Sequence, residues 1–342
     1  MPQNFLGLTN IGVLRSFIYR SRKALWPKLV ILCYHRIENY ITDPVKITVS
    51  KNNFFKHIDF LKEFAHIIHP DQLFESLTKR KNLPRRSILL TFDDGYSSYK
   101  DTMQFLKKEF ISAMFFITIR KKKHWWDILS KLLFHHQHVE NNVYKEINNI
   151  LANRGYAFKI EEYIDSNSIQ TLRNWDITKA KFPFKRNKAF YLLARAMEES
   201  NHFESNSLLE SLSGLTNETR DFSYLDEKNL IDYHKLGFHT INHFNLSKLS
   251  YNNQKKEIEI GKKSLDARLG KNVETFAYPF GNKIHYNNDT LKIVKKNFKY
   301  AFSNFEGLVH KDSNIYELPR FLVRDWDVDN FIIKVKTFFK EK

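Results

Sequence analysis

Two adjacent carboxylates follow an apolar run in the first third of the chain. Residues 87–92 (Ser-Ile-Leu-Leu-Thr-Phe) are typical of a buried β-strand, and Asp93, Asp94 and Gly95 come directly after them. Neighbouring carboxylates cannot both be buried and ionised unless a positive charge lies close to them. A metal ion is the simplest such partner, and Gly95 permits the tight turn that would direct both side chains into a cleft. We therefore expect a strand that ends at a metal site, with one carboxylate as ligand and its neighbour as base.

Strand and helix patterns alternate on both sides of this run. Further strands are predicted at residues 28–35, 111–119, 235–239, 273–278 and 300–304. Helices are predicted at residues 54–64, 98–110, 225–234, 252–269 and 290–297. Repeated strand–helix units imply right-handed parallel crossovers. Because polar residues follow several of the strands, the pattern predicts an α/β fold, a distorted or incomplete (β/α) barrel with its chemistry at the carboxyl ends of the strands.

The alternation stops between residues 121 and 222, where the chain is polar and its patterns are helical. Trp125 and Trp126 lie near the start of this stretch, and either core packing or contact with sugar rings or lipid headgroups would explain them. The predicted organisation has three parts: a basic amphipathic segment at 1–28, a barrel built from 29–120 and 223–342, and a helical insertion at 121–222.

Composition narrows the classes of partner. The formal net charge of +17 favours an anionic partner, such as an acidic glycan, a phospholipid surface or nucleic acid, although a lysine-rich surface is often only solvated. The chain contains no helix-turn-helix, zinc-finger spacing or aromatic RNA-binding motif, so nucleic acid is not an expected partner. The single cysteine, Cys33, excludes an internal disulfide framework and fits a reducing compartment.

Residues 11–26 combine apolar side chains at near-helical spacing with several arginines and lysines. This pattern predicts an amphipathic helix, which either packs against the core, the reading we favour, or lies on an anionic membrane surface. No run is long and apolar enough for a membrane span, and no secretory leader is recognised. We therefore expect a cytoplasmic protein, with peripheral attachment to the inner membrane face as the alternative.

A histidine pair marks a second strand end. His239 and His243 follow a short apolar strand, and their spacing of four predicts that both imidazoles lie on one face of a helical turn. Alone, such a pair is often a surface coincidence. With Asp94 it makes two imidazoles and one carboxylate, the donor set of a catalytic zinc site that leaves positions open for water.

Two more strand ends carry candidate groups. Residues 278–281 (Tyr-Pro-Phe-Gly) predict a rigid turn, either an ordinary one or one whose exposed N–H donates to an oxyanion. His35 ends the first predicted strand. It is either a satisfied core histidine or a side chain that points into the same barrel mouth as Asp93.

Together these stretches resemble the polysaccharide deacetylases of carbohydrate esterase family 4, the NodB-homology group. Residues 91–95, 239–243 and 278–281 are similar to the three motifs of that family, in the same order. The resemblance implies a NodB-type barrel and a metal-dependent hydrolase. The reaction would remove an N-acetyl or related N-acyl group from an amino sugar in a polysaccharide, an oligosaccharide or a lipid-linked glycan precursor. The alternative is a catalytically inactive glycan-binding protein on the same fold.

The same resemblance implies a role for each motif residue. Asp94, His239 and His243 would hold a divalent metal, for which we expect zinc. Asp93 would be the base that activates the attacking water, and the backbone N–H of Phe280 would donate to the oxyanion.

The chain departs from the family pattern at three places, one of which is the insertion at 121–222, which is much larger than the motifs require. The usual carboxyl-terminal histidine motif is not obvious, and His310 is a weak candidate for it. A subgroup that acts on poly-N-acetylglucosamine has this histidine permuted to the amino terminus, which favours His35 as general acid. Ala277 stands where an arginine often holds the catalytic aspartate, so either Arg320 or Arg324 is expected to replace that arginine.

Residues close to the motifs are expected to contact the glycan. They are Tyr96, Tyr278, Pro279, Arg320 and Trp326.

Overall fold

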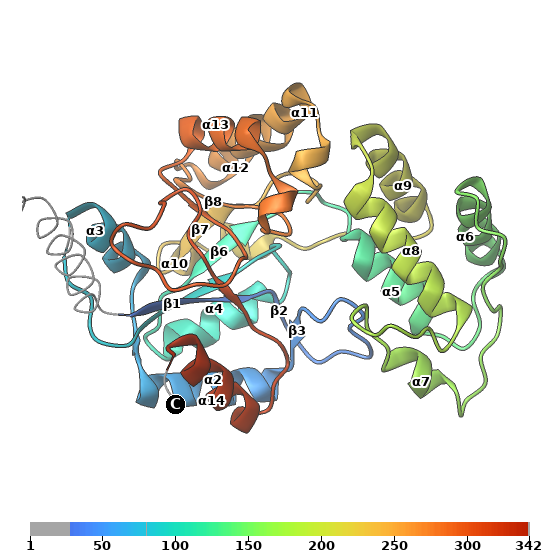
Figure 1. Ribbon diagram of the computed structural model, residues 1–342, viewed down its shortest axis with the longest axis horizontal. Helices are drawn as coiled ribbons and strands as arrows, with labels where there is room; N and C mark the ends of the chain where they lie inside the picture. Colours follow the sequence, from blue (N-terminus) through green and yellow to red (C-terminus); the bar gives the residue numbers. More distant parts are fainter. Residues whose placement is uncertain (1–27, 80, 341–342) are drawn as a thin grey trace, which may run out of the picture.

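Parallel strands form a curled sheet at the centre of the molecule (Figure 1). The computed structural model describes residues 28–79 and 81–340, so the amphipathic segment predicted at 1–28 lies almost wholly outside the described residues. Strands β1 (Leu29–Tyr34) and β5 (Ser87–Phe92) are buried along their whole length, as expected for largely apolar strands when both faces of a sheet are covered. The other strands of the path are shorter: β6 (Met114–Ile117), β7 (Lys235–Phe238), β8 (Thr275–Ala277), β9 (Tyr300–Phe302) and β10 (Phe321–Leu322).

The sheet follows the order β10-β1-β5-β6-β7-β8-β9, and each neighbouring pair is parallel. The short β4 (His66–Ile67) pairs with the start of β5. Among the described residues, β9 and β10 are connected by the segment that precedes β10 and not by direct strand pairing. In it, Leu318 N donates to Ala301 O at 2.9 Å and Leu318 O accepts from Ser303 N at 2.9 Å. The predicted incomplete barrel is thereby confirmed, and the gap between β9 and β10 is where the barrel stays open.

Helices cover the outside of the curled sheet. In Figure 1, α2 (Lys51–Phe64), α4 (Tyr99–Lys108) and α14 (Val328–Phe338) lie below the strands. Helix α2 is capped at its N-terminus by Ser50, whose side chain accepts a hydrogen bond from Asn53 N, and it buries Phe54, Ile58 and Leu61 at helical spacing. The remaining helices of the barrel are α3 (Pro70–Lys79), α10 (Lys228–Ile231), α11 (Tyr251–Lys255), the π-helical turn Lys256–Ile260, α12 (Gly261–Leu269) and α13 (Asn288–Asn297).

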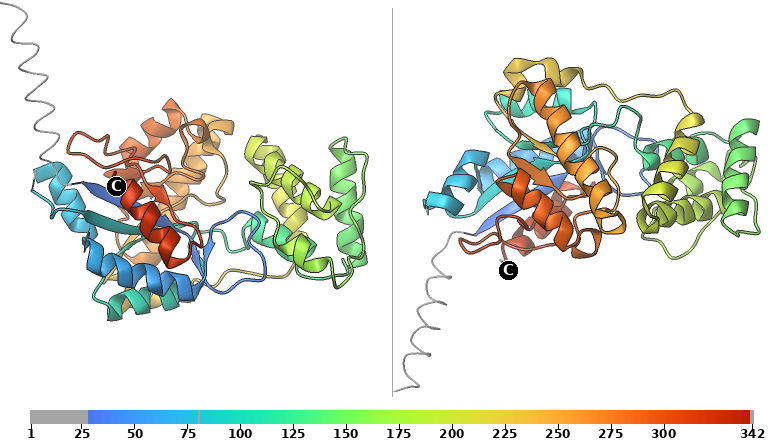
Figure 2. Two further views of the ribbon diagram at one scale, coloured as in Figure 1. Left: turned by 60° about the horizontal axis from the view of Figure 1, so that its bottom comes forward. Right: turned by 90° about the horizontal axis from the view of Figure 1, so that it is seen from above.

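A separate group of helices projects from the barrel (Figures 1 and 2). It comprises α5 (Trp125–Phe134), α6 (Asn141–Asn153), α7 (Ile169–Arg173), α8 (Lys185–Glu199) and α9 (His202–Gly214). These helices lie inside the range predicted as an insertion and share an aromatic centre in which Trp175, Phe134 and Phe190 contact one another. The insertion therefore has apolar packing of its own, and it reaches the barrel through the start of α5 and the end of α8.

Several short elements differ from the sequence-based expectations. The helix predicted at 225–234 is split into a 3₁₀ turn (Ser223–Asp226) and α10, and the strand predicted at 111–119 shortens to β6. Helices α3 and α14 and the small strands β2 (Arg36–Ile37), β3 (Thr48–Val49), β4 and β10 were not predicted. A strand of two residues shows no periodicity, so only its sheet partner defines it. Across residues 28–79 and 81–340, no helix has the length and apolar character needed to cross a membrane.

Candidate active site

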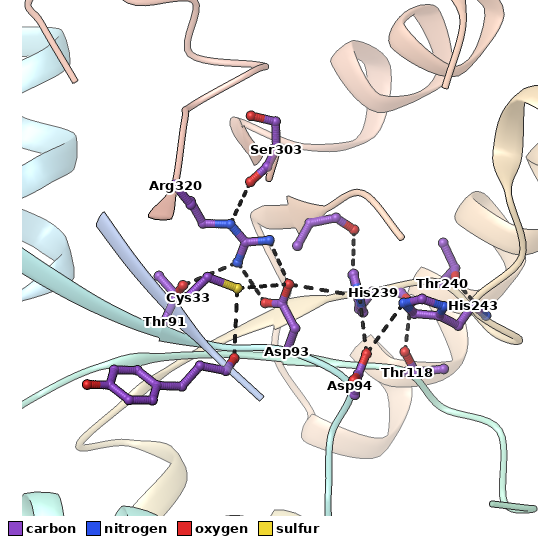
Figure 3. A network of polar contacts seen from close by, with 12 residues as sticks. Cys33, Thr91, Asp93, Asp94, Thr118, His239, Thr240, His243, Ser303 and Arg320 are labelled. Atoms are coloured by element: carbon purple, nitrogen blue, oxygen red, sulfur yellow. Dashed lines mark hydrogen bonds and ion pairs between the residues drawn. The ribbon is translucent and has the colours of Figure 1, made fainter. Parts of the chain in front are cut away.

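A cavity of about 280 Å³ opens at the carboxyl ends of the barrel strands, where the insertion meets the barrel. Four predicted site residues from two different strand ends, those of β5 and β7, line it, and Figure 3 shows how closely they approach one another: Asp93, Asp94, His239 and His243. His35 and Phe280 line the same cavity. The structure thus brings together the proposed base, ligands, acid and oxyanion donor, which are far apart in the sequence.

Unusual backbone conformations direct these side chains. Asp94, Thr240, His243 and Phe280 have φ values of 84°, 67°, 59° and 58°, in the left-handed region that non-glycine residues seldom adopt. The prediction that the two histidines share a helical turn is therefore wrong, because β7 ends at Phe238 and Thr240 and His243 both have positive φ. Such residues cost of the order of 1–3 kcal/mol each and gather at functional sites. These strained conformations direct both imidazoles towards Asp94.

Asp94, His239 and His243 have the geometry of a metal-ligand set. The Nε2 atoms of both histidines lie 3.5 Å from Asp94 Oδ1, and the three donor atoms lie within 4.8 Å of one another. Ligands of a tetrahedral zinc with bonds of about 2.0 Å are about 3.3 Å apart, which is close to these separations. Asp94 Oδ1 is buried and has no hydrogen-bond partner within the described residues. Its lone pairs therefore suit a cation, and the donor set fits a divalent metal.

Burial and partners tune the ionisation of these ligands. Burial alone would raise the pKa of Asp94, but the neighbouring histidines, His239 first, hold that pKa well below its usual value. Burial lowers the pKa of His243 to about 3, although Asp94 opposes this shift. An ionised carboxylate and a neutral imidazole are the forms that bind metals.

Backbone groups orient the first histidine. His239 Nδ1 lies 2.7 Å from the carbonyl oxygen of Ala277, so Nδ1 carries the proton and Nε2 faces Asp94. Ala277, where the family motif often has arginine, thus contributes through its backbone. The His243 ring is held between Trp126 and Phe280, with centroids at 5.0 and 4.9 Å.

Arg320, and not Arg324, supports Asp93. Its Nη1 and Nη2 donate to the two carboxylate oxygens of Asp93 at 2.7 and 2.6 Å, and its Nε donates to Ser303 O at 2.7 Å (Figure 3). Burial would raise the pKa of Asp93, but the Arg320 guanidinium outweighs it and the pKa is lowered. Cys33 Sγ also approaches Asp93 Oδ2 at 3.6 Å. Arg320 is fully buried and is not among the residues that line the cavity, so the structure contradicts the expectation that it contacts substrate.

His35 reaches Asp93 because β1 and β5 are in register. Tyr34 pairs with Phe92, so the next residue of each strand lies at the same edge of the sheet. His35 Nδ1 is buried without a partner within the described residues, and burial lowers the pKa of the ring. His310 follows Val309, which bridges Leu29 at the opposite end of β1, about 20 Å away for a strand of six residues.

The insertion supplies contacts that the sequence did not reveal. Arg220 is buried and donates to the carbonyl oxygens of Asp94, Gly95 (2.7 Å) and Arg120 (3.2 Å), and His124 Nε2 lies 3.3 Å from Asp94 O. Gly95 has a φ of 74°, and a Cβ there would lie 2.9 Å from the Arg220 guanidinium. One arginine among 55 basic residues carries no local signal, so sequence reasoning had no means of finding it.

Of the four other residues predicted to contact the glycan, two lie at or beside the cavity and two lie outside it. Tyr278 lines the cavity, although its hydroxyl donates to Tyr316 O at 2.9 Å, and Pro279 is buried beside it. Two assignments are corrected. Tyr96 lies outside the catalytic cavity, where its hydroxyl accepts from Trp126 Nε1 at 2.8 Å, and Trp326 packs on α14 against Phe331 and Phe338.

The N–H of Phe280 is available to a ligand. It donates to no acceptor within residues 28–79 and 81–340, while the following Gly281 N turns back to Pro279 O at 2.6 Å. The predicted oxyanion donor therefore lies on the cavity wall with its backbone group unpaired.

The chain is similar to one protein family and to several named proteins. The family described as "Polysaccharide deacetylase" matches residues 80–167 and 227–301. A poly-β-1,6-N-acetyl-D-glucosamine N-deacetylase of Staphylococcus aureus (strain MSSA476) is 34% identical over 133 residues, 34% of this chain and 44% of that protein. The protein of the same name from Staphylococcus epidermidis is 29% identical over 161 residues, 45% of this chain and 54% of that protein. The chain thus spans about half the length of these relatives.

Solved structures share the fold. The Streptococcus pyogenes deacetylase PplD superposes with a TM-score of 0.53 at 17% identity, covering 90% of this chain and 98% of PplD. A de-N-acetylase from Aggregatibacter actinomycetemcomitans gives a TM-score of 0.50 at 14% identity, covering 90% and 99%. At these identities the likeness establishes the NodB-type barrel alone.

Proposed function

We propose, from the match of residues 80–167 and 227–301 to the polysaccharide deacetylase family, that the protein is a metal-dependent hydrolase that removes an N-acetyl or related N-acyl group from an amino sugar. The substrate would be a unit of a polysaccharide, an oligosaccharide or a lipid-linked glycan. The observation that carries the proposal is the convergence of Asp94, His239 and His243 beside an Arg320-paired Asp93. Binding a glycan requires neither a metal-ligand set nor an ionised base.

A divalent ion, for which zinc is our proposal, would polarise the acyl carbonyl and lower the pKa of water towards about 7. Asp93 stays ionised beside Arg320 and accepts a proton from the attacking water. As the new C–O bond forms, the Phe280 N–H donates to the developing oxyanion. His35, as the imidazolium, gives a proton to the amide nitrogen as the C–N bond breaks, which leaves a carboxylate and a free amino sugar. The proton that Asp93 accepted then restores the imidazolium of His35.

The relatives suggest which sugar to test first. The staphylococcal proteins are named for poly-β-1,6-N-acetyl-D-glucosamine, so we propose N-acetylglucosamine units as the first substrate class. A cytoplasmic location, with the inner membrane face as alternative, also remains a proposal. It is motivated by the single cysteine and the net charge of +17. Fractionation of cells and flotation with anionic liposomes would test it.

The decisive experiment is mass spectrometry on a panel of N-acyl glycans and lipid-linked sugars incubated with the zinc-loaded chain. We expect the loss of one acyl group from at least one member. Glycan binding without acyl loss at any metal tested would instead identify an inactive glycan-binding protein.

Two variants separate metal binding from proton transfer. Asp93→Asn should retain the metal and lose turnover by a factor of about 10² or more, because the base is gone while the ligands stay. His239→Ala should lose the metal itself. Metal content by atomic emission and turnover by acetate release would check both, and loss of metal in Asp93→Asn would contradict the assignment.

A further inference from the structure

Buried polar atoms without a protein partner gather around the active-site cavity. Within the described residues, six such atoms belong to residues that line it: His35 Nδ1, Asp94 Oδ1, Trp125 Nε1, His243 Nδ1, His285 Nδ1 and Asn304 Oδ1. Buried polar atoms are almost always hydrogen-bonded, so a cluster of exceptions indicates groups that a ligand satisfies. Three of the six belong to the metal and acid centre already described. The other three, on Trp125, His285 and Asn304, have no role in that chemistry.

Trp125 differs from the other tryptophans at the start and centre of the insertion. It is the first residue of α5 and only 4% exposed, yet its Nε1 meets no acceptor within the described residues. Trp126 Nε1 donates to Tyr96 OH at 2.8 Å and Trp175 Nε1 donates to Lys181 O at 3.0 Å. A buried indole N–H usually finds a partner, so Trp125, which lines the cavity, retains an unused donor.

His285 offers an acceptor whose orientation is set by the insertion. Its Nε2 lies 3.0 Å from Glu198 Oε1, at the end of α8. Hydrogen bonding to His285, with Arg195 nearby, lowers the pKa of Glu198, so the carboxylate accepts from an Nε2–H. In the neutral imidazole the other nitrogen, Nδ1, is then an acceptor.

Asn304 offers a second acceptor. It follows β9, and its N–H donates to Gly281 O at 2.8 Å, which holds it against the oxyanion turn. Gly281 must be glycine for this approach, because a Cβ there would lie 2.4 Å from Asn304 Cβ.

We propose that Trp125, His285 and Asn304 recognise the hydroxyl groups of a neutral N-acyl amino sugar, so that the insertion determines substrate specificity. A sugar hydroxyl both donates and accepts, and it can satisfy one indole donor and two acceptors. A phosphate or carboxylate group has no proton to donate to His285 Nδ1 or Asn304 Oδ1, and it would lie close to the Glu198 carboxylate, which lines the same cavity. This inference rests on the proposed function, since it names the sugar that the deacetylase site would take.

The test uses full-length protein and two probes that differ in hydroxyl groups. One is a β-1,6-linked N-acetylglucosamine tetramer, and the other is N-acetylcyclohexylamine, an N-acetyl amide without hydroxyls. In the zinc-loaded Asp93→Asn variant labelled with ¹⁵N-tryptophan, the indole resonance of Trp125, assigned with Trp125→Phe, should shift with the tetramer and not with the amide. An unmoved Trp125 indole at saturating or highest soluble tetramer would overturn the inference.

Kinetics give the second readout. Trp125→Phe keeps the ring and removes the N–H, and we expect about a tenfold lower kcat/KM for the tetramer. Asn304→Leu, which removes the second acceptor, should also lower kcat/KM for the tetramer about tenfold. Trp175→Phe, the same change at a satisfied indole in the same insertion, should stay within about twofold of the wild type. Equal kcat/KM in Trp125→Phe and the wild type would refute the proposal. If the wild type deacetylates nothing, the proposed function fails and the indole titration alone decides the inference.

Discussion

At the scale of single residues, the site depends on backbone strain and on one buried ion pair. Asp94, His243 and Phe280 each adopt positive φ, and each places a different group at the cavity: a carboxylate, an imidazole and a backbone N–H. Glycine would relieve the strain of about 1–3 kcal/mol at Asp94 or His243 and would delete the ligand. Arg320 compensates the buried charge of Asp93, which would otherwise cost several kcal/mol.

The choice between two histidines is also decided at this scale. We expect His35→Ala to lower kcat by a factor of about 10²–10⁴, because it removes the acid at the amide nitrogen. His310→Ala is the matched control and should leave kcat nearly unchanged, since Val309 anchors that segment at the far end of β1. Steady-state acetate release measures both. A large loss in His310→Ala with none in His35→Ala would reverse the assignment.

At the scale of elements, the insertion and the barrel form the site together. The end of the insertion carries Arg220, whose guanidinium holds the carbonyls of Asp94 and Gly95, and its beginning carries His124 at the same loop. Burial lowers the pKa of Arg220, whose hydrogen-bond acceptors among the described residues are carbonyl oxygens and include no carboxylate. Such a buried group is tolerated because it fixes the turn that presents Asp94.

Arg220 therefore acts as a positioning residue. We expect Arg220→Met to weaken zinc affinity about 10–100-fold, because the loop that presents Asp94 loses its support. Arg268→Met is the control, since Arg268 is partly exposed and donates to Phe222 O and Asp226 away from the metal loop. Competition with a chromogenic chelator measures the affinity. An unchanged zinc affinity in Arg220→Met would show that the turn at Asp94 keeps its conformation without Arg220.

At the scale of the whole molecule, two buried histidines outside the site link stability to pH. His57 on α2 stacks on Phe331 of α14 at 3.7 Å and contacts Trp326 O at 2.8 Å, and His234 contacts Met103 O at 3.0 Å. Burial lowers the pKa of each to about 4, from an ordinary value of about 6.5. Both rings are therefore neutral in the folded protein over a range where the unfolded chain takes up protons.

Stability should then fall on acidification through this range. The contribution of both histidines is complete above pH about 6.5 and is lost as the pH falls towards about 4, because only the unfolded state binds the protons. Urea unfolding of the metal-free protein at pH 7.5 and 5.0 would measure the free energy of unfolding. His57→Phe should reduce the difference between the two pH values, and an unaltered difference would contradict the assignment.

Local sequence determined the strands and the polar residues that end them. Apolar runs such as 87–92 must be buried, and a barrel of parallel strands brings their carboxyl ends together, so Asp93, Asp94, His239 and His35 were predictable as neighbours. Tertiary structure alone decided which groups complete the site. The choice of Arg320 over Arg324, the clamp of Arg220 and the unpaired indole of Trp125 arise where segments distant in sequence approach within hydrogen-bond distance. Such contacts depend on geometry across the fold, and periodicity and residue spacing carry no information about them.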